Sequence, residues 1–177
     1  MKKARVRAPK AMLIAVDGVD PSAIVAAARV ALGSPSRGGI SKWDASGVFQ
    51  ELAVADEAAG APSPRTLLLL YAADLAFRLR WQIRPALAEG RTVVAAPYVD
   101  TALAFGRAAG LKPLWLMNLF RFAPKPARRH FVHKRAAAVK DGFVGFSSKR
   151  MSAGAGLTPR QMIAETSAQL RRYDRQD

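Results

Sequence analysis

The sequence predicts an α/β protein in three layers, in which a parallel sheet of about four to five strands is covered by helices on both faces. Short, almost wholly apolar runs such as MLIAV (12–16) and TVVAA (92–96) have the length and composition of central strands in a parallel sheet. Longer segments with apolar residues at helical spacing separate these runs. This alternation is typical of parallel sheets, because each crossover needs a connection of helical length.

Cap residues define the first elements. The chain begins with a basic, proline-containing arm, residues 1–10, and residues 11–177 are long enough for a single domain with its own core. Asp20 and Pro21 are typical of the N-cap and first position of a helix, and Gly33 ends that helix. The expected elements here are a strand at 12–16, a helix at 21–32, a loop at 33–39, a strand at 39–43 and a helix at 46–58.

The second part of the chain continues the alternation. The longest helical pattern runs from Pro64 to Glu89, and Pro85 is expected to kink or divide it. Thr158 and Pro159 are typical of the start of a last helix, which extends to about Tyr173. The other elements expected are a strand at 92–96, helices at 100–109 and 113–122, a strand at 128–134, a strand or loop at 142–146 and a flexible stretch at 147–156.

The composition excludes several classes of protein. The chain has no cysteine, and its two histidines, His130 and His133, are predicted to face opposite sides of a strand, so we expect no metal site. The longest apolar stretch, 66–77, is interrupted by Asp74 and is too short to cross a membrane. The apolar run at the N-terminus leads directly into two aspartates, which argues against a signal peptide. We therefore expect a cytoplasmic protein without a membrane partner.

The net charge of +15 is concentrated in the second part of the chain. Residues 1–100 carry 13 lysines and arginines against 9 acidic residues, whereas residues 101–177 carry 15 against 4. The basic residues expected to form one face are Arg128, Arg129, Lys134, Arg135, Arg171 and Arg172. Such a face favours nucleic acid or an acidic protein as partner. A merely solvated basic surface is the alternative interpretation.

The order of these pieces resembles the thymidylate kinase family of P-loop nucleoside monophosphate kinases. Four stretches carry the resemblance, and together they cover about two thirds of the chain: MLIAVDGVD, the segment from RTLLLLYAAD to YVDTALAF, LKPLWLMNLFRFAPKPARRHFV, and LTPRQMIAETSAQL. The resemblance implies a P-loop-NTPase-like fold, a nucleotide as ligand and a homodimer formed through helices.

The phosphate-binding loop departs from the family pattern G-x-x-x-x-G-K-[ST]. Gly18 fits the first position, but Ala23, Ile24 and Val25 occupy the positions of the second glycine, the lysine and the hydroxyl residue. Pro21 also removes an N–H from the loop. The positions that remain from a phosphate loop are Asp17, Gly18, Asp20 and Ser22. For Asp17 and Asp20, a structural role in the turn and the helix cap is the alternative interpretation.

Two other parts of the family's machinery differ as well. The Asp-Arg-Tyr motif aligns with Ala96, Pro97 and Tyr98, so its aspartate and arginine are replaced. Leu75 stands where an arginine usually follows the Ala-Ala-Asp stretch, and only KRAAAVKDGF remains in the place of the mobile lid. Because phosphoryl transfer depends on positioning and charge stabilisation, these changes together are expected to abolish ordinary transfer from a nucleoside triphosphate.

Part of the monophosphate pocket is retained in the alignment. Its residues are Lys42, Tyr71, Asp74, Arg78, Tyr98 and Phe105. The resemblance implies that Tyr71 stacks on the base and that Phe105 lies near the base and sugar, while Lys42 and Arg78 can replace lost arginines. The alternatives are core packing for Tyr71 and Phe105, a solvated charge for Lys42, and a structural ion pair for Asp74.

Two functional hypotheses follow. The first is a non-catalytic thymidylate kinase-like protein with a binding or scaffold role, which keeps a residual nucleotide pocket and uses its basic face for nucleic acid or an acidic partner. It has no catalytic residues and needs no cofactor. The second is a divergent nucleoside monophosphate kinase that transfers phosphate from ATP to thymidine monophosphate, with magnesium and ATP as cofactors.

Overall fold

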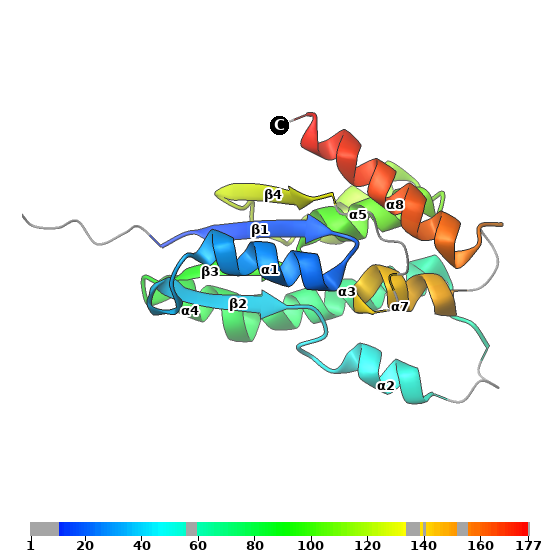
Figure 1. The fold of residues 1–177 in the computed structure, drawn as a ribbon. Coiled ribbons are helices and arrows are strands. Elements are labelled where there is room, and N and C mark those ends of the chain that lie inside the picture. The colour runs from blue at the N-terminus through cyan, green and yellow to red at the C-terminus, as the bar shows by residue number, and fades with distance from the viewer. Residues whose placement is uncertain (1–10, 56–59, 134–138, 140, 152–155, 177) are drawn as a thin grey trace, which may run out of the picture.

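A four-stranded parallel sheet forms the centre of the molecule (Figure 1). The computed structural model describes residues 11–55, 60–133, 139, 141–151 and 156–176. The strands are β1 (Leu13–Gly18), β2 (Gly38–Lys42), β3 (Thr92–Ala96) and β4 (Arg128–Val132). They lie in the order β2-β3-β1-β4, and every adjacent pair is parallel. The predicted fold class is confirmed, with four strands.

Helices cover both faces of the sheet. They are α1 (Pro21–Leu32), α2 (Val48–Val54), α3 (Pro64–Arg78), α4 (Arg84–Ala88), α5 (Val99–Ala108), α6 (Pro113–Phe120), α7 (Gly142–Arg150) and α8 (Pro159–Asp174), with a short 3₁₀ turn η1 (Pro35–Arg37) and a π-helical segment η3 (Leu79–Ile83). None of the helices in the described ranges is long and apolar enough to span a bilayer. The arm at residues 1–10 lies outside the described residues.

Alternate residues of the strands supply two separate cores. Ile14 and Val16 of β1 pack with α1, whereas Leu13 and Ala15 of the same strand join the larger core formed with α3, α5 and α8. This division follows from the two-residue period of a strand, which directs successive side chains to opposite faces. The three predicted layers are therefore α1, the sheet, and the remaining large helices.

The cap residues of α1 act as predicted. Asp20 is the N-cap, Pro21 is the first helical residue, and Gly33 ends the helix with a φ of 75°. A positive φ of this size costs little for glycine, which has no Cβ to clash with the following carbonyl. The cap fixes the direction in which the chain leaves β1.

Pro85 is accommodated inside a continuous helical stretch. It lacks an N–H, so it cannot donate to the carbonyl four residues earlier. The backbone passes from α3 through the π-helical η3 into α4, and the residues at both junctions keep right-handed helical angles. The expected disturbance at Pro85 therefore takes the form of a local widening of the helix.

The prediction for residues 142–156 was wrong in part. Residues 142–146 were expected as a strand or loop and the following residues as flexible, yet Gly142–Arg150 form helix α7. Glycine and β-favouring residues make GFVGF a poor helix by propensity. Burial of Phe143, Val144 and Ser147, which lie on one side of the helix, outweighs that preference.

Candidate functional site at the carboxyl ends of the strands

The loop after β1 uses its own backbone donors. Pro21 has no N–H, the amides of Ser22 and Ala23 donate to Asp20 Oδ1 at 2.9 and 3.2 Å, and the amide of Ile24 donates to the Asp20 carbonyl at 2.9 Å. The N-terminus of a helix attracts anions through such amides. Here the carboxylate of Asp20 already occupies that position.

Asp17 and Gly18 connect the end of β1 to the start of α5. Asp17 Oδ1 accepts hydrogen bonds from the Tyr98 amide at 2.9 Å, the Thr101 amide at 2.9 Å and Thr101 Oγ1 at 2.7 Å. The Gly18 amide donates to Thr101 Oγ1 at 3.1 Å. Burial, reinforced by the negative charge of Asp100, raises the pKa of Asp17 to about 7 although these donors lower it. Thr101 is a partner that the sequence alone did not reveal.

Gly18 leaves no room for a side chain or an approaching phosphate on its Cβ side. A Cβ there would lie 3.1 Å from Ile24 Cγ1 and 3.1 Å from Val132 Cβ. The Ile24 side chain, at the position of the family's lysine, is 3% exposed and belongs to the core between α1 and the sheet. Gly18 therefore permits close packing of α1 and β4 against the end of β1.

A small cavity of about 180 Å³ lies beside this loop. Its walls come from Pro21, Ile24 and Val25 of α1, from Ala96 at the end of β3 and the following Pro97, and from Phe143 and Val144 of α7. Lys42, which is exposed, and Trp43 stand at its rim. Most of the lining residues are apolar, and Lys42 is the one with a positive charge.

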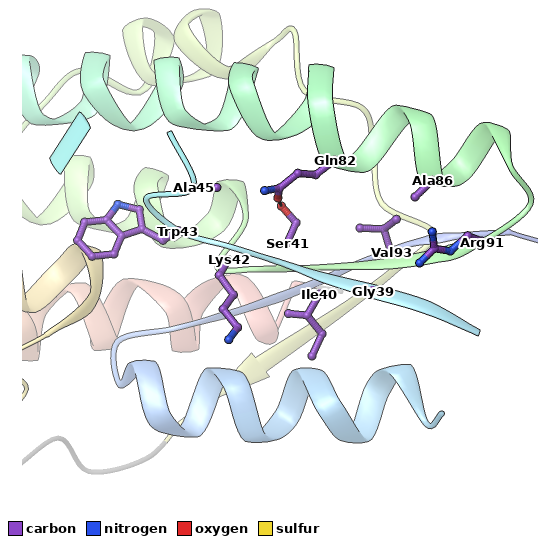
Figure 2. Close-up of a pocket in the computed structure, with 10 residues that line it drawn as sticks. All are labelled: Gly39, Ile40, Ser41, Lys42, Trp43, Ala45, Gln82, Ala86, Arg91 and Val93. Atoms are coloured by element: carbon purple, nitrogen blue, oxygen red, sulfur yellow. Dashed lines mark hydrogen bonds between the residues drawn. The ribbon is translucent and has the colours of Figure 1, made fainter. Parts of the chain in front are cut away.

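A second cavity, of about 360 Å³, lies along the outer edge of β2 (Figure 2). Figure 2 shows Lys42 extending from β2 towards the blue helix α1, whereas Ser41 and Gln82 face each other on the other side of the strand. Ser41 Oγ donates to Gln82 Oε1 at 2.8 Å. Arg91 stands at the far end and pairs with Glu89 at 3.4 Å. Lys42 and Trp43 border both cavities.

The three aromatic residues of the expected monophosphate pocket, Tyr71, Tyr98 and Phe105, lie in the core. Tyr71 and Phe105 are both 0% exposed. The Phe143 ring of α7 lies 4.5 Å from the Tyr71 ring and 5.1 Å from the Phe105 ring, measured between centroids. The Tyr71 hydroxyl donates to the Tyr98 carbonyl, and burial raises the pKa of Tyr71 well above its usual range. Tyr98 in turn donates its hydroxyl to the Pro124 carbonyl at 2.8 Å.

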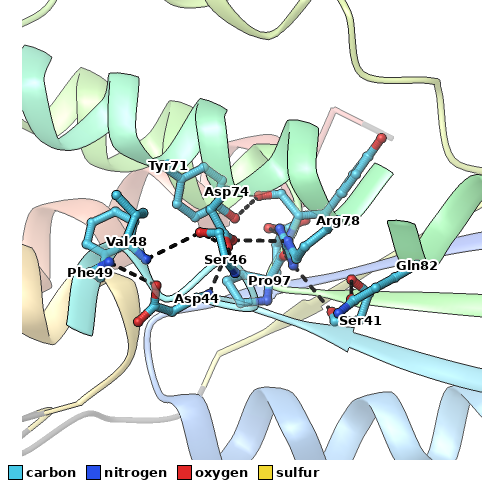
Figure 3. A network of polar contacts seen from close by, with 12 residues as sticks. Ser41, Asp44, Ser46, Val48, Phe49, Tyr71, Asp74, Arg78, Gln82 and Pro97 are labelled. Carbon is cyan, nitrogen blue, oxygen red and sulfur yellow. Dashed lines mark hydrogen bonds and ion pairs between the residues drawn. The ribbon is translucent and has the colours of Figure 1, made fainter. Parts of the chain in front are cut away.

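Asp74 and Arg78 form a buried ion pair at the centre of a polar network (Figure 3). Arg78 Nε lies 3.2 Å from Asp74 Oδ2, and both side chains are 0% exposed. Asp74 also accepts hydrogen bonds from the amides of Asp44 and Ser46 and from Ser46 Oγ, at 3.2, 3.0 and 2.9 Å. Arg78 donates from both terminal nitrogens to the Pro97 carbonyl at 3.0 Å. The pair therefore holds the loops after β2 and β3 together.

The described residues of the predicted basic face lie on β4 and at the end of α8. Arg128, Arg171 and Arg172 are exposed, whereas Arg129 forms an ion pair with Asp100 at 3.0 Å and lies over the Phe131 ring. His133 Nε2 lies 2.7 Å from Asp174 Oδ2, so the last turn of α8 is beside the end of β4. Lys134 and Arg135, also predicted for this face, lie outside the described residues.

Comparisons with known proteins agree with this architecture. No family model matches the chain. Over 58 residues it is 43% identical to probable thymidylate kinases of Pyrococcus abyssi and Thermococcus kodakarensis, a match that covers 33% of this chain and 28% of each relative. The crystal structure of thymidylate kinase from Ehrlichia chaffeensis superposes with a TM-score of 0.70 at 13% identity, covering 95% of this chain and 89% of that one. The fold is thus that of a thymidylate kinase-like P-loop kinase.

Proposed function

We propose that this protein is a non-catalytic thymidylate kinase-like protein whose loop after β1 does not bind a nucleoside triphosphate. The observation that carries the proposal is the occupation of the α1 N-terminus by Asp20, which accepts the amides of Ser22 and Ala23. A triphosphate would have to displace this carboxylate and approach its negative charge. The loop thus offers repulsion where a phosphate loop offers donors.

The position of Ile24 supports the same conclusion. Its apolar side chain is buried between α1 and the sheet, where the family pattern has a lysine that faces the phosphates. Val25 supplies no hydroxyl for a magnesium ion. Because transfer of a phosphoryl group relies on cations that neutralise the developing charge, the loop lacks the groups that lower the barrier.

The residues expected to bind the nucleoside monophosphate also support the proposal that the protein is non-catalytic. Arg78 was a candidate to replace a lost arginine, but its guanidinium is committed to Asp74 and to the Pro97 carbonyl. Tyr71 and Phe105 are covered by Phe143. A thymine ring would have to displace Phe143 to stack on Tyr71. Under this proposal the aromatic residues are core residues.

Isothermal titration separates the proposal from the alternative of a divergent nucleoside monophosphate kinase. We expect no binding heat from ATP with magnesium, nor from thymidine monophosphate. The control is the variant Asp20→Asn, whose side chain keeps the cap but loses the charge. Saturable binding of both nucleotides to the wild type would refute the proposal and support the kinase.

The exposed arginines support a binding role for the region around β4 and α8. We define the basic surface as Arg128, Arg171, Arg172 and Arg175, all exposed. We propose that it contacts the phosphates of a nucleic acid, with an acidic protein as the alternative. Contacts of this kind release counterions, so affinity falls steeply with salt and depends little on base sequence.

Fluorescence anisotropy with short RNA and DNA tests the basic surface. We expect binding at low salt that weakens as salt rises, and a loss of at least about tenfold in the double variant Arg171→Glu, Arg172→Glu. Arg91→Glu, just before β3, is a charge-reversal control outside the basic surface. Equal binding by all three proteins would exclude this surface as the site of contact. No binding at low salt would exclude nucleic acid and leave an acidic protein as the proposed partner.

An apolar surface on the outer helices supports the homodimer that the family resemblance implies. Leu69 of α3, Trp81 of η3, and Leu114 and Met117 of α6 are each more than half exposed. Residues of α3 and α6 contact each other, so Leu69 lies on a helix next to the one that carries Leu114 and Met117, and η3 with Trp81 continues α3. Exposed apolar groups of this size favour association, because burial removes them from water. We propose a dimer formed through this face.

A further inference from the structure

The 180 Å³ cavity beside α1 is built for an apolar ligand of limited size. Its inner wall consists of buried side chains, among them Ile24, Ala96, Pro97, Phe143 and Val144. An apolar cavity of about 150 Å³ is large enough to bind one benzene molecule. A single six-membered ring or a branched chain of four to five carbons therefore matches the available volume.

The rim of the cavity differs from its floor. Pro21, Val25, Trp43 and Gly142 are partly exposed, and Lys42 is exposed. A ligand can thus enter between these residues and leave one end near solvent. The Lys42 ammonium has no ion-pair partner among the residues that the structure describes, so it is available to an anionic group at that end.

The charge pattern selects the anion. A triphosphate or phosphate monoester carries two or more charges and needs several donors, whereas this cavity offers one cation above an apolar floor. A carboxylate carries one charge and tolerates an apolar body directly beside it. One lysine at the rim and a mostly apolar floor are matched to such an amphipathic monoanion.

From these features we propose that the cavity binds a small monocarboxylate with an aromatic ring or a branched aliphatic chain. The carboxylate pairs with Lys42 at the rim, and the apolar part lies between α1, the end of β3 and α7. This inference rests on the proposed function, because it requires that the loop after β1 no longer receives phosphate. The ligand site then occupies the place at the carboxyl ends of the strands where α/β proteins bind their ligands.

Trp43 gives a direct readout, since it borders the cavity. In the variant Trp81→Phe, Trp115→Phe it is the one remaining tryptophan of the chain, which has three. Titration of this protein with phenylacetate and with isovalerate is expected to change the Trp43 emission saturably, with a dissociation constant of about 1 mM or lower. Phenylacetamide, which has the same shape without the charge, is expected to bind about tenfold more weakly.

Three variants locate the site. Lys42→Met should weaken phenylacetate at least about fivefold without changing phenylacetamide. Val25→Phe should fill the cavity from its partly exposed side and abolish both. Arg91→Met, which removes a cation from the 360 Å³ cavity, is the matched control and should bind like the parent. Unaltered binding in Val25→Phe, or no saturable change with either acid up to about 20 mM, would overturn the inference.

The same titration distinguishes this inference from the proposed function. A saturable change of Trp43 emission by ATP with magnesium would refute the proposed loss of triphosphate binding, and the inference would fall with it. If ATP has no effect and the carboxylates also have none, the proposed function stands and this inference alone is refuted.

Discussion

Introducing a lysine at position 24, where the thymidylate kinase family pattern has one, is expected to destabilise the protein rather than to produce a kinase. Ile24 is 3% exposed and packs between α1 and the sheet. Ile24→Lys removes the burial of an isoleucine, which contributes about 1.5–3 kcal/mol. It also places an ammonium in apolar surroundings, which costs several kcal/mol. The flexible lysine recovers part of this cost by reaching towards solvent. We expect a loss of about 3–5 kcal/mol in the free energy of unfolding, against a total of about 5–15 kcal/mol for a domain.

Urea denaturation followed by circular dichroism measures this loss. Ile24→Val, which keeps the position apolar, is the matched control and should cost about 0.5–1.5 kcal/mol. Adding Val25→Ser to Ile24→Lys should not restore ATP binding, because Asp20 still occupies the helix N-terminus. The reasoning would be refuted by a double variant that is as stable as the wild type and binds ATP with magnesium.

Three further predictions concern the buried polar groups and the outer helices. The Asp17 pKa is raised from 3.8 to about 7 in the folded state, so near pH 5 the native protein holds a proton that the unfolded chain has released. The free energy of unfolding, relative to that of Asp17→Asn, should therefore fall by about 1 kcal/mol per pH unit from pH 5 to 7 and then level off. Urea titrations in which this difference rises with pH would contradict the prediction. Asp74→Asn leaves the buried Arg78 guanidinium without its counter-charge and should lower the free energy of unfolding, measured in urea titrations, by about 3–5 kcal/mol. The double variant with Arg78→Met should recover part of this loss. Additive losses from the two substitutions would argue against the ion pair. Sedimentation equilibrium should report a dimer for the wild type and a monomer for Trp81→Glu, Met117→Glu, and a monomeric wild type would exclude the proposed dimer face.

The elements that could be predicted are those whose local sequence agrees with their environment. The strands 12–16 and 92–96 are apolar because both of their faces are buried, and Asp20, Pro21 and Gly33 define α1 by local backbone chemistry. Helix α7 could not be predicted, since its stability comes from the contact of Phe143 with rings distant in sequence.

In the candidate site, too, contacts between residues distant in sequence could not be predicted. The sequence predicts which positions of a phosphate loop are replaced, but it does not reveal the partners of the residues at those positions. That Thr101 bonds Asp17, and that Arg78 bonds the Pro97 carbonyl, depends on the meeting of β1, α3 and the turn after β3. For Asp74, the sequence raised the question of a structural pair or a ligand contact because an unpaired buried carboxylate is costly, and the structure answers with Arg78.

The most direct test of the account is transfer of labelled γ-phosphate from ATP to thymidine monophosphate, measured with magnesium and with protein in excess over ATP. We predict no labelled thymidine diphosphate above the protein-free background, because position 24 holds isoleucine in place of a lysine and the Ser22 and Ala23 amides already donate to Asp20. Gel filtration serves to separate activity of this chain from that of a contaminating kinase. Product that forms in proportion to the wild-type protein and co-elutes with it would contradict the account.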